Sequence, residues 1–339
     1  FLGVNDYETL PALLDSLDER KIIANSCTET ELPEVKVRTD GSMYSATLKI
    51  AEGCNNRCAY CIIPFIRGNY RSKRQEAVIT EAKALAEAGC RELILIAQDT
   101  TYYGYDLYGE YRLPQLLKQL CQIDGIRWIR LMYCYEDRIT DELIQTIRED
   151  DKICNYLDIP IQHASDNILK AMKRRSTNRS ITDKIAKLKE QIPDIHIRTT
   201  LITGFPGETE EDFDTLYDFV AEQRFARLGV FAYSQEEGTV AGQMPNQIDE
   251  EIKTERADSI MRLQMEISLE KNRSKIDTVQ EVIVDEIDED GSYIGRTRYD
   301  APEIDNAVIF TGKQEHKPGD MVMVHIDDAF DYDLAGTEV

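Results

Sequence analysis

Short apolar runs alternate with amphipathic segments through most of the chain. The apolar runs predict six strands, at residues 45–50, 93–97, 128–133, 156–161, 196–202 and 228–233. Apolar residues at helical spacing predict the helices between them, at residues 80–88, 113–122, 140–149, 165–174, 181–191 and 209–223. Strands that are apolar throughout are typical of a parallel sheet with both faces covered, so the pattern predicts an α/β fold. The strand count alone leaves two architectures open, a doubly wound open sheet and a partial barrel.

The pattern changes at both ends of this α/β region. Residues 249–275 predict a long charged helix with a narrow apolar stripe, and short strands follow at residues 278–285, 291–298, 306–310 and 321–327. At the other end, residues 5–17 predict an amphipathic helix and residues 29–40 a polar linker. We therefore expect three parts: residues 1–40, an α/β region at residues 41–274, and a small all-β domain at residues 275–339.

Charge and cysteine content narrow the class of protein. The 339 residues are 42% apolar and carry a formal charge of −23. No run reaches the ~18 apolar residues of a membrane helix, and no signal segment opens the chain. The 8 cysteines, with a cluster among them, indicate a metal site in a reducing cytoplasm and not a disulfide framework. Such an acidic chain is not expected to bind nucleic acid directly. It favours a basic partner or none, since acidity by itself mostly increases solubility.

Three cysteines lie together directly after the first predicted strand. Cys54, Cys58 and Cys61 have the spacing C-x3-C-x2-C. Structural zinc normally takes four protein ligands, and no fourth cysteine or histidine lies nearby in the sequence. Three thiolates on a cubane iron–sulfur cluster leave one iron open for a small chelating ligand. The spacing therefore favours a cluster over the alternatives, a zinc-knuckle fragment or three buried thiols.

The stretch GCNNRCAYCIIPFIRG at residues 53–68 resembles the cysteine loop of the radical-SAM enzymes. Its tail, IIP at residues 62–64 with Arg67-Gly68, resembles the methylthiotransferase branch of that family. The resemblance implies a partial (β/α)6, TIM-like barrel with a [4Fe-4S] cluster on Cys54, Cys58 and Cys61. It also implies S-adenosylmethionine (SAM) on the open iron and a separate electron donor. The strands after residue 275 resemble the TRAM domain that closes the methylthiotransferases.

The opening segment, FLGVNDYETL, resembles the last element of the N-terminal domain of methylthiotransferases. In that family, three further cysteines upstream hold a second [4Fe-4S] cluster, and Cys27 does not match one of them. Phe1 is not an initiator methionine, so we expect the chain to be part of a longer protein that carries the second cluster.

Polar residues beside the predicted strand ends are candidates for SAM contacts, because such barrels place their chemistry at the C-terminal ends of the strands. By resemblance, Tyr60 lies against the adenine, Gln98 with Asp99 binds near the amine, and Gln162 reaches the ribose. Arg198 lies inside an apolar strand and needs a carboxylate partner, for which the SAM carboxylate is one candidate. The alternatives are a packed ring for Tyr60 and a solvated loop for Gln98. No residue is assigned a catalytic role.

A basic run interrupts the acidic chain after the fourth predicted strand. It consists of Lys170, Lys173, Arg174, Arg175 and Arg179. The run predicts a solvated helix face, and contact with a substrate acid or phosphate is the second interpretation.

Two branches of the family fit the chain. The stretches AQDTTYYGYDLYG (97–109), GRTRYDAPEID (295–305) and AFDYDLAGT (329–337) resemble the branch that adds a methylthio group to the β-carbon of an aspartate in ribosomal protein S-twelve. The other branch modifies an adenosine of tRNA. From residue 275 onward there are 5 basic and 17 acidic side chains, a formal charge of −12, with acidic stretches at 285–290, 300–305 and 327–333 that we expect to be exposed. Such a domain suits a basic ribosomal protein, free or in the small subunit, better than it suits tRNA.

Overall fold

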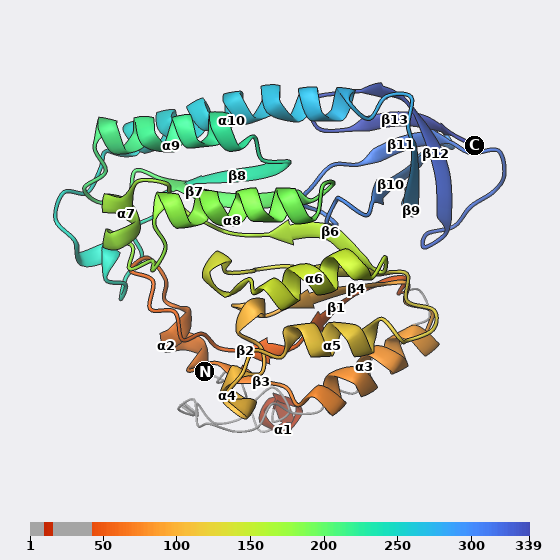
Figure 1. Cartoon of the computed structure of the whole chain (residues 1–339), viewed down its shortest axis with the longest axis horizontal. Helices are drawn as coiled ribbons and strands as arrows, with labels where there is room; N and C mark the ends of the chain where they lie inside the picture. The colour runs from red at the N-terminus through yellow and green to blue at the C-terminus, as the bar shows by residue number, and fades with distance from the viewer. Residues whose placement is uncertain (1–9, 16–42) are drawn as a thin grey trace.

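The computed structural model describes residues 10–15 and 43–339 (Figure 1). Of the helix predicted over residues 5–17, it describes α1 (Leu10–Asp15). The linker predicted at residues 29–40 and Cys27 lie outside the described residues. Among the residues that are described, no helix has the combined length and apolar character needed to cross a membrane.

Six parallel strands form the main sheet. They are β1 (Ser45–Lys49), β4 (Glu92–Ile96), β5 (Trp128–Leu131), β6 (Ile153–Asp158), β7 (His196–Thr203) and β8 (Arg227–Ala232). Their order in space, β1-β4-β5-β6-β7-β8, follows their order in the chain. A doubly wound sheet reverses its strand order at a switch point, whereas a barrel does not. The topology therefore confirms the partial barrel and excludes the open doubly wound alternative.

Helices cover the outer face of this sheet (Figure 1). They are α3 (Gln75–Glu87), α5 (Leu113–Leu120), α6 (Asp141–Glu149), α8 (Asn178–Gln191) and α9 (Glu210–Gln223). The short helix α7 (Asp166–Ala171) lies beyond the C-terminal ends of the strands, where Ile168 belongs to the same apolar cluster as Ala59 (Figure 1). Threonine side chains cap three of them, because the Oγ1 atoms of Thr140, Thr177 and Thr209 accept backbone N–H groups of the first turn. Leucine and isoleucine side chains of the strands and helices form one large buried core between the two layers.

Short elements make up most of the difference from the sequence prediction. The structure adds the hairpin β2 (Ala51–Glu52) and β3 (Arg71–Ser72), the helices α2 (Ile63–Arg67) and α4 (Tyr105–Tyr108), and the 3-10 turns η2 (Thr100–Tyr102), η3 (Glu136–Arg138) and η4 (Ala241–Gln243). Strand β6 also ends earlier than predicted, at Asp158 and not at residue 161. Pro160 accounts for this difference, because it has no N–H group to continue the ladder.

The 24-residue helix α10 (Glu250–Arg273) leads into a second unit. Its strands are β9 (Val279–Ile287), β10 (Tyr293–Thr297), β11 (Val308–Thr311), β12 (Met321–Ala329) and β13 (Leu334–Glu338), and they close a barrel in the order β10-β11-β13-β12-β9. The predicted all-β fold is thus confirmed, with one strand more than expected. Strand β13 has no apolar alternation, and its Gly336 is needed because a Cβ atom there would lie 2.3 Å from the carbonyl oxygen of His325.

The terminal barrel packs against the N-terminal ends of the sheet strands, opposite the cysteine loop (Figure 1). Glu92, the first residue of β4, lies 2.9 Å from Arg130 of β5 and 2.5 Å from Arg296 of β10. Arg227, the first residue of β8, lies 2.5 Å from Asp300. These ion pairs are buried, and an apolar cluster that joins Trp128 and Tyr156 to Ile283 also spans the contact, so the interface between the two units excludes water.

This interface corrects the expectation that all three acidic stretches of the terminal domain are exposed. The side chains of Asp300 and Asp305 are each 1% exposed, and Asp305 accepts a hydrogen bond of 2.6 Å from the Tyr156 hydroxyl. Asp285 is also partly buried, 3.0 Å from Arg296. The sequence prediction failed here because a run of carboxylates normally indicates a solvated surface. The arginines that pair with these carboxylates are distant in sequence, so the run alone does not reveal them.

Candidate functional site

The cysteine loop is the connection between the two strands of a small hairpin. Strands β2 and β3 pair Ala51 with Ser72, which brings the two ends of the loop together. Gly53 begins the loop with φ +79°, and a Cβ atom there would lie 2.2 Å from the carbonyl oxygen of Asn69. Only glycine fits this close backbone approach. The hairpin therefore fixes where the cysteine loop begins and ends.

The structure brings the three predicted cysteines together as free thiols. Cys54 and Cys58 are buried, and Cys61 is partly exposed. Burial, together with the neighbouring Asp99, Cys58 and Cys61, raises the pKa of Cys54 to about 11. Burial also raises the pKa of Cys61. The thiolates that bind metal are thus disfavoured until a metal displaces the protons.

This donor set fits an iron–sulfur cluster. It offers three sulfur ligands, one fewer than structural zinc normally takes. In the described part of the chain, no three histidine, cysteine or carboxylate side chains converge tightly enough to hold a single metal ion. In a cubane cluster each cysteine binds a different iron atom, so its ligands need not converge on one point.

A buried polar network fastens the loop to the sheet. Asp99 lies directly after β4 and accepts a hydrogen bond of 2.8 Å from the Asn56 side chain and another from Arg138. Arg138 also donates to the Asn56 side-chain oxygen at 2.9 Å. Burial alone would lower the pKa of Arg138, but Asp99 raises it above its usual value, so the guanidinium stays charged. Asp99 thus holds the cysteine loop and has its acceptors occupied.

Tyr60 lies inside the loop against a second apolar cluster. Its ring packs on a group of buried residues that includes Ala59, Phe205 and Tyr233. Burial raises the pKa of the Tyr60 hydroxyl, and the nearby Cys58 raises it further. The backbone of Ala59 is fixed on both sides, since its N–H donates to Met172 and its carbonyl accepts from Ala241. The structure therefore places Tyr60 beside the cysteines in a rigid setting.

Gln98 and Gln162 lie at the C-terminal ends of their strands. The Gln98 side-chain amide donates to Glu52 at 3.4 Å, and its oxygen, Oε1, is buried with no hydrogen-bond partner. A buried acceptor without a donor is costly unless a ligand completes it. Gln162 has φ +71°, and its backbone bridges to the far half of β7 at Leu201. Both residues remain candidates for contacts with a bound cofactor.

Arg198 lies in a different place. It is near the start of β7, and its side chain is 3.0 Å from Asp158 and 3.5 Å from Asp305 of the terminal barrel. The carboxylate partner that the sequence required is therefore supplied by the protein itself. The structure groups Arg198 with the interface between the two units and not with the cysteine loop, so we do not retain its assignment to the SAM carboxylate.

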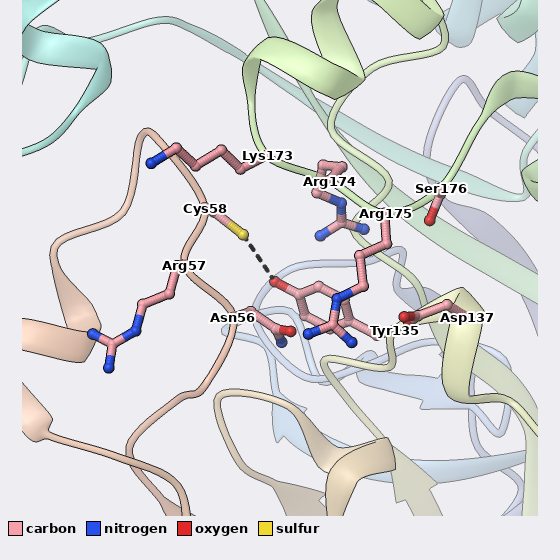
Figure 2. Close-up of a pocket in the computed structure, with 9 residues that line it drawn as sticks. All are labelled: Asn56, Arg57, Cys58, Tyr135, Asp137, Lys173, Arg174, Arg175 and Ser176. Carbon is pink, nitrogen blue, oxygen red and sulfur yellow. Dashed lines mark hydrogen bonds between the residues drawn. The ribbon is translucent and has the colours of Figure 1, made fainter.

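The basic run after α7 lies partly inside the site. Three of its residues, Lys173, Arg174 and Arg175, line a small recess beside Cys58 with a volume of about 30 Å³ (Figure 2), whereas Lys170 and Arg179 do not. We call this the Cys58 recess; its walls include Cys58, Tyr135, Arg57, Lys173, Arg174 and Arg175. The Cys58 sulfur and the Tyr135 hydroxyl are 3.5 Å apart. Arg174 is buried, so the prediction of a fully solvated basic face is wrong at this residue.

Comparison with known proteins relates this geometry to a family. Residues 48–220 match the model of the Radical SAM superfamily, and residues 276–339 match that of the TRAM domain. A protein from Clostridioides difficile (strain 630) is 50% identical over 337 residues, which is 99% of this chain and 76% of that protein. Another, from Lachnoclostridium phytofermentans, is 49% identical over 99% of this chain and 77% of its own. Both are named ribosomal protein uS12 methylthiotransferase RimO.

The chain belongs to the RimO family. A further RimO protein, from Desulforamulus reducens, is 55% identical over 86% of this chain and 66% of its own length. Membership confirms the predicted radical-SAM methylthiotransferase and favours the ribosomal-protein branch over the tRNA branch. The contacts predicted for individual residues are not tested by these relatives.

Sequence reasoning missed several residues of this RimO chain that shape the site. Asn56 and Arg138 tie the loop to Asp99, and Tyr135 lies against Cys58. The only signal for Arg138 was its charge after an apolar strand, and nothing in the spacing links it to a residue 39 positions earlier. Such pairs become visible only when the strand order is known.

Proposed function

We propose that this chain is the catalytic core of an enzyme that adds a methylthio group to the β-carbon of an aspartate in ribosomal protein uS12. The observation that carries the proposal is the three-cysteine loop of a RimO-family chain, held by a hairpin at the C-terminal edge of a partial barrel. A tRNA adenosine substrate is the alternative that the experiment below must exclude.

In this proposal, Cys54, Cys58 and Cys61 hold a [4Fe-4S] cluster that leaves one iron for SAM. When bound, the cluster supplies the electron for reductive cleavage of SAM. The unpartnered Oε1 of Gln98 would accept a hydrogen bond from the SAM amine. Tyr60 would pack against the adenine, and Gln162 would contact the ribose.

The remaining residues orient these groups and exclude water. Asp99, Arg138 and Asn56 fix the loop, while Phe205 and Tyr233 form a buried aromatic wall beside Tyr60 with ring centroids 5.4 Å apart. Exclusion of water matters for radical chemistry, since it prevents side reactions of reactive intermediates.

The domain limits and the partners are part of the same proposal. We place the boundary between the barrel core and the TRAM-like domain near residues 274 and 275, between the end of α10 at Arg273 and the start of β9 at Val279. The substrate partner would be uS12, free or in the small subunit, in the cytoplasm. A separate protein would deliver the electron. The second [4Fe-4S] cluster stays an expectation for the full-length protein.

Anaerobic reconstitution tests the cluster. The wild-type chain should take up about four irons and then cleave SAM when reduced. Cys58→Ala should lose both properties, whereas Cys121→Ser, at another buried free thiol, should keep them. Full iron content and SAM cleavage by Cys58→Ala would exclude the proposed ligand set.

Substrate choice is tested separately. With uS12 and with tRNA offered in parallel, we expect the reconstituted chain to bind uS12 more tightly, as measured by the equilibrium dissociation constants. Preferential binding of tRNA would transfer the proposal to the adenosine-modifying branch.

A further inference from the structure

Cations gather around the Cys58 recess although the chain as a whole has a charge of −23. Figure 2 shows Lys173, Arg174 and Arg175 coming from one segment, and Arg57 coming from the cysteine loop on the other side of Cys58. In the described chain, no ion pair joins Lys173 or Arg175 to a carboxylate. The recess is therefore a local positive site on an acidic protein.

One of these cations, Arg174, is buried in the wall of the Cys58 recess. The Arg174 side chain is 2% exposed and lies 3.0 Å from Glu136, and its guanidinium stacks 4.3 Å from the centre of the Tyr135 ring. One of its nitrogens, Nη1, is buried and has no hydrogen-bond partner. Although burial lowers the pKa of Arg174, Glu136 and its neighbours raise it above the usual value, so the group stays charged. A buried donor is thus left for an acceptor that enters the recess.

The backbone of the same segment positions its other two cations, Lys173 and Arg175, at the rim of the recess. Lys173 has φ +59°, a left-handed conformation that is costly for a residue with a side chain. This residue ends the turn after α7, and it places Lys173 and Arg175 on the two sides of the buried Arg174. The turn is a helix C-cap, in which the Arg174 N–H donates to the Leu169 carbonyl at 2.8 Å, so the direction in which these side chains leave the helix is fixed.

We propose that the Cys58 recess binds the side-chain carboxylate of the substrate aspartate, an inference that rests on the proposed function. A volume of about 30 Å³ holds one small polar group, and guanidinium groups bind carboxylates in a fixed orientation. An aspartate approaching a protein with charge −23 is repelled unless cations offset that charge locally. A carboxylate held beside Cys58 positions the adjacent β-carbon near the cysteine loop, where the reaction takes place.

The SAM carboxylate has the same chemistry, so the experiment must separate the two sources. The variant Lys173→Gln/Arg175→Gln removes the two exposed cations that follow α7 and leaves Arg57 on the cysteine loop and the buried Arg174 in place. The matched control Lys170→Gln/Arg179→Gln removes the same charge from the same segment outside the recess. The probes are two uS12 peptides, one with the modifiable aspartate and one with asparagine in its place. Their affinities, and that of SAM, are measured on the reconstituted enzyme.

The wild type and the control should bind the aspartate peptide about tenfold more tightly than the asparagine peptide, a difference of about 1.4 kcal/mol. The recess variant should lose that preference and keep its affinity for SAM. An unchanged preference would overturn the inference, and so would weaker SAM binding with the preference intact, which would assign the recess to SAM. If the wild type binds neither peptide but binds tRNA, the proposed function itself is wrong.

Discussion

Asp99 illustrates how a residue with the right position can have a different role from the one its position suggests. It follows β4 directly, which is where sequence reasoning places a contact with the SAM amine. The structure instead binds its carboxylate to Asn56, Arg138 and Thr101. The residue before it, Gln98, keeps the free acceptor.

Replacing Asp99 with alanine should destabilise the protein by about 3 kcal/mol, because Arg138 would be left buried without its carboxylate. Urea denaturation of the metal-free protein measures the change. The exposed Asp124→Ala provides the control. In the double variant Asp99→Ala/Arg138→Met the loss should be smaller, since no charge is left unpaired. A loss below about 0.5 kcal/mol in the single variant would show that the network contributes nothing to stability.

Lys275 predicts an unusual dependence of stability on pH. Its Nζ atom is buried with no hydrogen-bond partner, 5.4 Å from the centre of the Tyr299 ring. Burial lowers its pKa to about 8, against 10.5 in an exposed lysine. Between these two values the unfolded chain binds more protons than the folded one, so the lysine's contribution to stability rises with pH in that window.

Lys275→Met should therefore be more stable than the wild type by about 2 kcal/mol at pH 7, and the difference should shrink between pH 8 and pH 10. Chemical denaturation at several pH values measures this, with the exposed Lys317→Met as control. A difference that stays constant across that range would mean that Lys275 does not lose its proton there.

The candidate site was predictable from sequence only where its residues lie close together in the chain. The cysteine spacing placed the three predicted cluster ligands and Tyr60 within eight residues of one another, and the structure brings these four residues close together. Arg198 was misplaced because an arginine in an apolar strand shows only that a carboxylate must be near. Which carboxylate it is depends on how Asp158 and Asp305 are brought to it by two different units.

At the scale of elements, hydrophobic periodicity predicted the long helices and the sheet strands, because their burial extends over several turns or ladder positions. It failed for the β2–β3 hairpin and for the 3-10 turns, which are held by a few backbone hydrogen bonds and by single side chains. The hairpin has only two residues in each strand, yet it determines how the cysteine loop leaves the sheet. Elements too short to show a period can therefore be essential to the site.

The contact between sheet strands and terminal barrel gives a prediction at this scale. Burial alone would raise the pKa of Glu92, but Arg130 and Arg296 hold it below its usual value. Glu92→Gln should destabilise the protein by about 3–5 kcal/mol, because both guanidinium groups lose their shared carboxylate. Trp128 reports on this interface, since it is the single tryptophan and its Nε1 donates to Glu281 of β9 at 3.3 Å.

We expect the tryptophan fluorescence of Glu92→Gln to change at a lower urea concentration than the far-UV circular dichroism, because the barrel separates before the sheet unfolds. The exposed Glu87→Gln should leave both transitions where they are in the wild type. Coincident transitions and an unchanged midpoint in Glu92→Gln would show that the ion pairs do not hold the two units together.

At the scale of the whole molecule, the charge of the terminal domain has two parts. Carboxylates such as Asp300 and Asp305 form buried ion pairs in the interface between the two units, whereas others are exposed and can contact a partner protein. The exposed ones include Glu286, Asp288, Glu289 and Asp290. Because Lys275 and Arg296 of this domain are buried as well, the charge that remains on its surface stays close to the total of −12.

Neutralising those four exposed residues together, to Gln or Asn, should slow association with a basic partner such as uS12 by about tenfold at low salt. The effect should fade toward 1 M salt, where charges are screened within about 3 Å. Stopped-flow association rates measure it. A matched control neutralises Glu211, Asp214, Asp218 and Glu222, which are exposed on α9. Equal slowing by both sets would mean that only net charge matters and that the terminal domain is no special docking surface.

The buried ion pairs between the sheet strands and the terminal barrel also limit which TRAM-like domains can be joined to this radical-SAM barrel. A TRAM-like domain transplanted from another enzyme would need residues equivalent to Arg296 and Asp300, because Glu92 and Arg227 of the recipient barrel would otherwise be buried without ion-pair partners. A donor lacking either would bury an unmatched charge and lose several kcal/mol at the junction. We therefore expect a chimera to fold stably only when both sides of this interface come from the same protein.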